Sequence, residues 1–205
     1  MNKILIIALV LSSAVLAKDW SSYITSFETS YIKDLSYNSS GLSIKVNYDY
    51  YEGKKATALL GIEMIYSKYS FPDDFPLDAS FDTPTQMLIS KTTSTHLNFY
   101  AGSNFYFLDS FSLIADSYLG LFLVNVKGSY ENTTYGIYET ENISQLFFDY
   151  GIRFGFAYDI ADTLSIQVLL SKSLRTIHED HSFIVWASGS EDAPTRINYG
   201  IKYYF

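Results

Sequence analysis

The chain ends in a strictly alternating stretch, Thr195-Arg-Ile-Asn-Tyr-Gly-Ile-Lys-Tyr-Tyr-Phe205. Successive side chains of a β-strand point to opposite faces, so the stretch predicts one strand with an apolar face and a polar face. Its length suits a tilted strand that crosses a bilayer, which needs roughly nine to eleven residues. The apolar face carries Ile197, Tyr199, Ile201, Tyr203 and Phe205, and the polar face carries Arg196, Asn198, Gly200, Lys202 and Tyr204.

Seven earlier stretches alternate in the same way, so eight strands are predicted, at 20–31, 42–50, 57–66, 96–105, 113–123, 148–158, 164–173 and 195–205. Short turns follow the second, fourth and sixth strands, at 52–54, 108–110 and 161–162. Long loops are expected at 32–41, 67–93, 127–144 and 176–194. An up-and-down barrel with both termini at one end produces this alternation of short turns and long loops.

The size of the side chains predicts which face points into the barrel. The stretch 148–158 has bulky residues on one face, whereas the other face carries Gly151, Gly155 and Ala157 beside Asp149 and Arg153. An eight-stranded barrel has little room inside, so the bulky face is expected to point outward to lipid. Tyrosines near the ends of several apolar faces fit aromatic girdles at the membrane boundaries. The predicted fold class is all-β, an eight-stranded antiparallel up-and-down transmembrane β-barrel.

The first residues have the pattern of an export signal. Lys3 is followed by the short apolar run 4–11 and by Val15-Leu16-Ala17, so residues 1–17 are predicted to be a cleaved signal peptide and residues 18–205 a single barrel domain. The chain has no cysteine, which excludes a disulfide scaffold. Its formal net charge of −8 argues against nucleic acid as a partner.

The signal, the eight strands, the loop asymmetry and the aromatic end Tyr203-Tyr204-Phe205 together resemble the small outer-membrane β-barrels of the OmpA/OmpX type, over the whole mature chain. The resemblance implies a bacterial outer membrane, with periplasmic termini and long extracellular loops. It implies that Tyr203 and Phe205 form the signal read by the outer-membrane assembly machinery. Outer-membrane lipid, lipopolysaccharide and periplasmic chaperones would be further partners. No periplasmic peptidoglycan-binding domain follows the last strand, so cell-wall anchoring is not expected.

The polar faces of the strands predict a charged lumen. Charges with little access to water must be paired, and the two signs are nearly balanced, so an internal plug of salt bridges is favoured over a gated small pore. The lumen network is predicted to consist of Glu28, Lys45, Asp49, Glu63, Asp116, Asp149, Arg153, Arg196 and Lys202.

No motif indicates catalysis, a metal or a cofactor. The sequence His178-Glu-Asp-His181 is one residue short of the HExxH pattern and has no helical context. His181 and Ser182 are adjacent, so the His-x-Ser arrangement of lipid A deacylases is missing. We therefore predict that the protein is not an enzyme and that it has neither a metal site nor a cofactor.

Aromatic side chains in the predicted loops favour a binding function, because aromatic residues on exposed loops are common binding hot spots. The predicted contacts with an extracellular ligand are Tyr135, Tyr138, Phe183 and Trp186. These observations favour a structural or surface-interaction role, such as adhesion, through acidic and aromatic extracellular loops. Two alternatives remain: a barrel enzyme that modifies outer-membrane lipid, and a secreted soluble β-barrel that binds a small apolar ligand.

Overall fold

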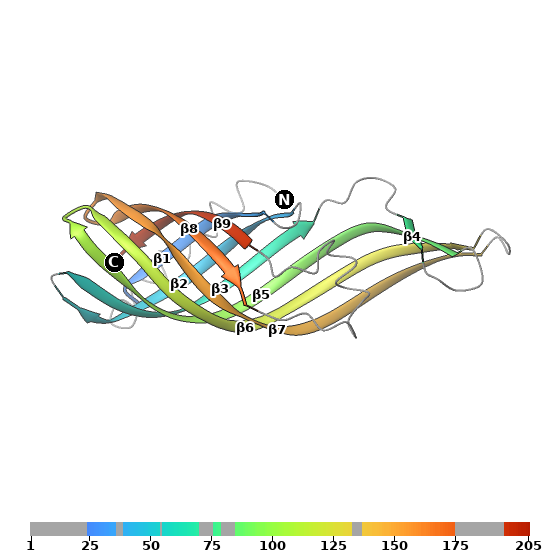
Figure 1. The fold of residues 1–205 in the computed structure, drawn as a ribbon, viewed down its shortest axis with the longest axis horizontal. Coiled ribbons are helices and arrows are strands. Elements are labelled where there is room, and N and C mark those ends of the chain that lie inside the picture. The colour runs from blue at the N-terminus through green and yellow to red at the C-terminus, as the bar shows by residue number, and fades with distance from the viewer. Residues whose placement is uncertain are drawn as a thin grey trace.

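The computed structural model shows a closed antiparallel β-barrel, from one end of which three strands project (Figure 1). The structure describes residues 24–35, 39–53, 55–69, 76–78, 85–132, 137–174 and 195–205. Within these ranges no helix is long and apolar enough to cross a membrane. The strands are β1 (Ser26–Asp34), β2 (Ser39–Glu52), β3 (Ala56–Tyr69), β4 (Pro76–Asp78), β5 (Thr85–Leu108), β6 (Phe111–Asn132), β7 (Ile137–Ala161), β8 (Leu164–Ser173) and β9 (Thr195–Tyr204).

The C-terminal strand closes the barrel. β9 pairs antiparallel with β1 on one side and with β8 on the other. On the opposite wall β3 pairs with β5, and the three-residue β4 lies outside the ring along β5. The predicted eight-stranded antiparallel up-and-down barrel is thereby confirmed.

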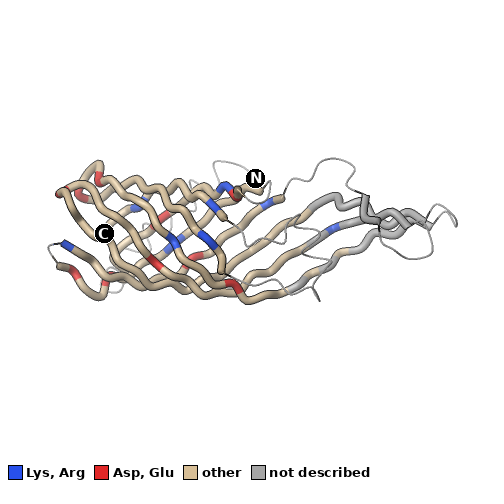
Figure 2. Tube along the Cα trace, viewed as in Figure 1, with Lys and Arg blue, Asp and Glu red and all other residues tan. Residues whose placement is uncertain are grey.

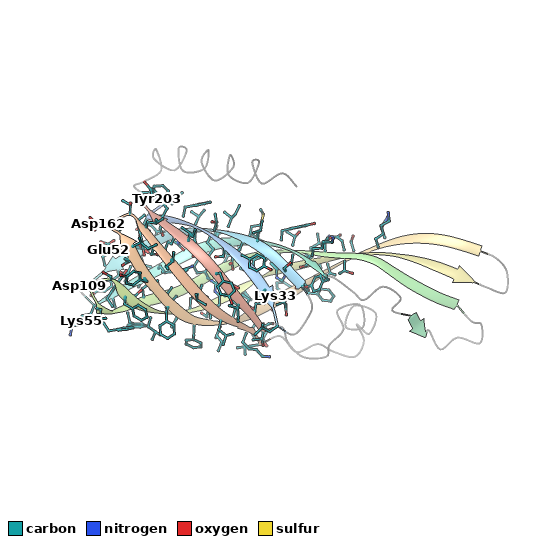
Figure 3. The ribbon with its side chains drawn as sticks, turned by 90° about the horizontal axis from the view of Figure 1, so that it is seen from above. Lys33, Glu52, Lys55, Asp109, Asp162 and Tyr203 are labelled. Atoms are coloured by element: carbon teal, nitrogen blue, oxygen red, sulfur yellow. The ribbon has the colours of Figure 1, made fainter. Side chains whose placement is uncertain are left out.

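The short turns gather at one end of the barrel, which we call the turn end. Figure 3 shows Glu52, Lys55, Asp109, Asp162 and Tyr203 together at this end and Lys33 towards the other end. Strand β1 also starts here, because Ser26 is the register partner of Tyr204. The described ends of the chain therefore meet at the turn end, as the sequence predicts.

The bulky apolar face of each strand points outward, as predicted. On β7, Phe148 is 72% exposed, whereas Arg153 is 1% exposed. The outward apolar residues of β7 run from Leu146 to Ile160, which at about 3.3 Å per residue and a tilt of about 40° covers roughly 35 Å along the barrel axis. That height is more than enough to cover the apolar band of a transmembrane barrel, about 25 Å. A soluble barrel for an apolar ligand would have this face inward.

Two of the predicted long loops are largely strand, which corrects the sequence prediction. β6 continues to Asn132 and β7 begins at Ile137, within the predicted loop 127–144. β5 begins at Thr85 and β4 at Pro76, within the predicted loop 67–93. Where a sheet lies outside the lipid, water contacts both of its faces. A strand can therefore continue there without alternating apolar and polar residues.

The limits of the first loop also differ from the prediction. β1 extends to Asp34 and β2 starts at Ser39, whereas residues 32–41 were expected to be loop. The predicted first strand began at Trp20, but residues 20–23 lie outside the described part of the chain. The predicted signal peptide, residues 1–17, lies outside it as well.

Candidate functional site

A chain of ion pairs crosses the middle of the lumen. Lys45 Nζ lies 2.8 Å from Glu28 Oε1 and 3.9 Å from Glu63 Oε1. On the far wall Arg153 Nη1 lies 2.6 Å from Glu63 Oε2, and its Nε lies 2.5 Å from Asp116 Oδ1. These side chains are buried, so each buried charge has a partner of opposite sign.

Two tyrosine rings lie against the guanidinium group of Arg153. The guanidinium carbon of Arg153 lies 4.6 Å from the Tyr100 ring centroid and 5.6 Å from that of Tyr118, within the range of cation–π attraction. Glycines make room for these rings. A Cβ atom at Gly61 would lie 2.5 Å from Tyr100 Cζ, and one at Gly151 would lie 2.6 Å from the Tyr118 hydroxyl. The alternation places both tyrosines inside, but the sequence did not indicate that they contact Arg153.

A second polar cluster lies nearer the end from which β5, β6 and β7 project. Arg196 Nε donates to Asp34 Oδ2 at 3.3 Å. His96 Nδ1 lies 3.8 Å from Asp149 Oδ2, and the Ser173 hydroxyl donates to Asp149 Oδ1 at 2.6 Å. Asp34 is not among the predicted lumen residues, because the sequence pattern places it in the loop 32–41, whereas it is the last residue of β1.

Eight of the nine residues predicted for the lumen network are buried inside the barrel. The ninth, Asp49, is half-buried and lines a cavity of about 520 Å³ at the turn end. The buried set is Glu28, Lys45, Glu63, Asp116, Asp149, Arg153, Arg196 and Lys202. Lys202 lies towards the turn end of the lumen, where its Nζ is 4.6 Å from the centroid of the Tyr204 ring.

Two clusters of apolar side chains also lie inside the lumen. Ile114, Ala157 and Leu169 form one buried cluster, and Leu59 packs with Tyr100 and Tyr118 in another. Leu169 occupies an inward position of the strand that was predicted to have a polar face. In the described lumen, these apolar clusters lie beside the paired charges.

The predicted loop contacts are only partly placed. Tyr138 lies in β7 opposite Glu131 of β6, so it belongs to a strand and not to a loop. Tyr135, Phe183 and Trp186 lie outside the described residues, as do His178 and His181. The predicted assembly-signal residues lie at the turn end, where the rings of Tyr203 and Phe205 meet edge to face with centroids 5.4 Å apart.

Solved structures show the same architecture. A major outer membrane protein from Thermus thermophilus aligns with a TM-score of 0.53 at 12% identity, over 88% of this chain and 99% of that one. The chain has the fold of an outer-membrane β-barrel. Ail of Yersinia pestis aligns with a TM-score of 0.44 at 15% identity, over 89% of this chain and 97% of Ail. Neisserial surface protein A aligns with a TM-score of 0.43 at 12% identity, over 90% of this chain and 98% of that protein. No protein-family model and no curated protein matches the sequence.

Proposed function

We propose that this chain is an integral protein of a bacterial outer membrane that acts at the cell surface, by adhesion or by binding an extracellular ligand. The observation that carries the proposal is the length of three neighbouring strands: β5, β6 and β7 contain 24, 22 and 25 residues. About nine to eleven residues are enough to cross a bilayer. Each strand is therefore about twice as long as a bilayer crossing requires, and the three strands project from one end of the barrel as a sheet that offers a binding surface (Figure 1).

The difference between the two barrel ends supports an orientation with the projecting sheet outside the cell. Outer-membrane barrels have short periplasmic turns and longer extracellular parts. The short turns and the C-terminus share one end here, and β5, β6 and β7 project from the other (Figures 1 and 3). The turn end would then face the periplasm.

The lumen supports a structural role in preference to transport. Its central charges pair with each other, and two buried apolar clusters occupy the space beside them. A barrel with a packed interior resists unfolding and carries the projecting sheet on a rigid base. We propose no catalytic role for the chain.

A trimmed variant tests the surface role. Lys127 of β6 is the register partner of Asn142 of β7, so replacing residues 128–141 by Asn-Gly joins these two positions through a two-residue hairpin. Cells of a non-adherent strain would display the full chain or the trimmed chain, and their adhesion to immobilised extracellular-matrix proteins and to each other would be counted. We expect adhesion with the full chain and background adhesion with the trimmed one.

The control is the amount of folded barrel in the outer membrane. Both chains should show the compact gel mobility of an unheated barrel and the slower mobility after boiling. Equal adhesion of the two displayed chains would contradict a binding role for the projecting sheet.

A further inference from the structure

One register row of outward side chains is polar across six strands. Lys33 of β1 pairs with Ser40 of β2, and Ser40 pairs with Lys68 of β3. The row continues through Thr93 of β5, Asn125 of β6 and Ser144 of β7. We call these six residues the polar row. The Ser144 hydroxyl donates to Asn125 Oδ1 at 2.7 Å within it.

The neighbouring outward row, two residues nearer the turn end on each of these strands, is largely apolar. It places Tyr31 beside Leu42, and Leu42 beside Tyr66. These three side chains are 48%, 39% and 45% exposed, on the outer face of the wall. Two outward tyrosines therefore lie directly below two lysines. Tyrosine beside an apolar band marks the boundary between lipid tails and headgroups, so Lys33, Ser40 and Lys68, the part of the polar row on β1, β2 and β3, lie at headgroup level.

Lys33 and Lys68 are positioned to act on one ligand. Paired strands are about 4.8 Å apart, so the two Cα atoms lie roughly 10 Å apart with Ser40 between them. Lysine carries its charge at the end of a flexible four-carbon chain. This chain can pack along the apolar outer surface of the barrel while the ammonium group reaches the headgroup layer. Both ammonium groups and the Ser40 hydroxyl can thus meet at one anionic group above the tyrosines.

The charges of the barrel wall differ between its two ends. Of the described acidic side chains, those that are exposed are Glu52, Asp109 and Asp162, and all three belong to the turn end (Figures 2 and 3). Lys68, Lys127 and Lys172 are exposed on the outer wall towards the opposite end. A basic wall at one headgroup layer attracts anionic lipid, by about 1 kcal/mol for each lysine near the surface.

We propose that Lys33, Ser40 and Lys68 form a binding site on the outer barrel wall for the phosphate groups of an anionic membrane lipid. The apolar row below receives the acyl chains of that lipid, and the two lysines and the hydroxyl receive its phosphate. The site lies on the lipid-facing wall of β1, β2 and β3 and does not depend on the surface role proposed for β5, β6 and β7.

The test measures lipid binding by the full chain in uncharged detergent, with native mass spectrometry. The probe is diphosphorylated lipid A, compared with the same lipid after removal of its phosphates. We expect the phosphorylated form to bind the wild type more tightly. The double variant Lys33→Ala/Lys68→Ala should bind it about thirty-fold more weakly, which corresponds to about 2 kcal/mol. The single variant Lys68→Ala should lie between the two.

Matched variants separate this site from a general effect of charge. Lys55→Ala removes an exposed lysine at the turn end and should leave binding unchanged. Lys33→Arg/Lys68→Arg keeps both charges and should bind within about threefold of the wild type. Compact gel mobility before boiling reports that each variant has folded. Equal binding of the two lipids, a double variant as tight as the wild type, or an equal loss with Lys55→Ala would overturn the proposal. Inorganic phosphate bound as tightly as the lipid would overturn the lipid as the occupant.

Discussion

Arg153 Nη1 lies 2.6 Å from Glu63 Oε2, although the two residues stand on strands β7 and β3, which are not neighbours in the barrel. The contact therefore spans the lumen. Asp116, by contrast, is the direct register partner of Arg153 on the adjacent strand β6. The guanidinium group of Arg153 thus pairs with Asp116 on the adjacent strand and with Glu63 across the lumen. It connects strands on opposite sides of the barrel.

Glu63→Gln should destabilise the barrel by about 3 kcal/mol, because it removes one partner of a buried arginine and of Lys45. The measurement is unfolding in urea of protein folded in lipid vesicles, read as the fraction that keeps compact gel mobility. Glu52→Gln changes an exposed carboxylate at the turn end and serves as the matched control, with an expected change within about 0.5 kcal/mol. A loss of stability no greater than that of Glu52→Gln would show that the ion pair between Glu63 and Arg153 contributes nothing to the stability of the barrel.

The loss of stability caused by an arginine on the lipid-facing wall should increase with the depth of the residue in the membrane. Val168 of β8 lies between Phe156 and Tyr199 in the apolar band, so Val168→Arg should destabilise by roughly 2 to 4 kcal/mol. Ile152 of β7 lies near the middle of the outward apolar residues of its strand, so Ile152→Arg should also destabilise by roughly 2 to 4 kcal/mol. Ser144→Arg, at an exposed polar position of the same strand, should cost roughly 0 to 1 kcal/mol. The same unfolding titration in vesicles compares the three variants. A larger effect at Ser144 than at Ile152 would contradict this placement of the membrane on the barrel wall.

Phe205→Ala should lower the yield of assembled barrel in the outer membrane. The aromatic end of β9 is the predicted signal for the assembly machinery, and the substitution also removes the edge-to-face contact with Tyr203. The measurement is the share of protein in the outer-membrane fraction that shifts in mobility on boiling. Refolding of the purified variant into detergent is the control, since a signal defect should spare it while a folding defect should not. Unchanged assembly in cells would exclude Phe205 as part of the signal.

The wild-type barrel should pass no steady current in a planar lipid bilayer, because paired charges and apolar clusters occupy its lumen. Arg153→Ala removes the central cation and leaves Glu63 and Asp116 without it, so small cation-selective steps are expected from this variant. Lys55→Ala is the control and should stay silent. Steady steps of equal size from wild type and variant would contradict a plug.

Much of the wall could be predicted from the sequence because a strand encodes its two faces locally. The alternation from Phe148 to Tyr158 gives the period, and glycines at positions 151 and 155 identify the narrow side. The inward position of the charged lumen residues follows from the same rule. The projecting parts of β5, β6 and β7 escaped prediction, because a strand with water on both faces needs no alternation.

Which lumen residues meet was decided by the closed barrel alone. The sequence assigns Glu28, Lys45 and Glu63 to inward faces, but their pairing depends on the register of β1, β2 and β3. The contact of Glu63 with Arg153 depends further on the diameter and stagger of the ring, which fix how far each side chain reaches across it. The alignment of Lys33, Ser40 and Lys68 in one row likewise depends on the register of β1, β2 and β3. The sequence by itself determined the inward and outward sides of each strand, and the register of the closed sheet determined which side chains stand together, since register depends on all eight strands at once.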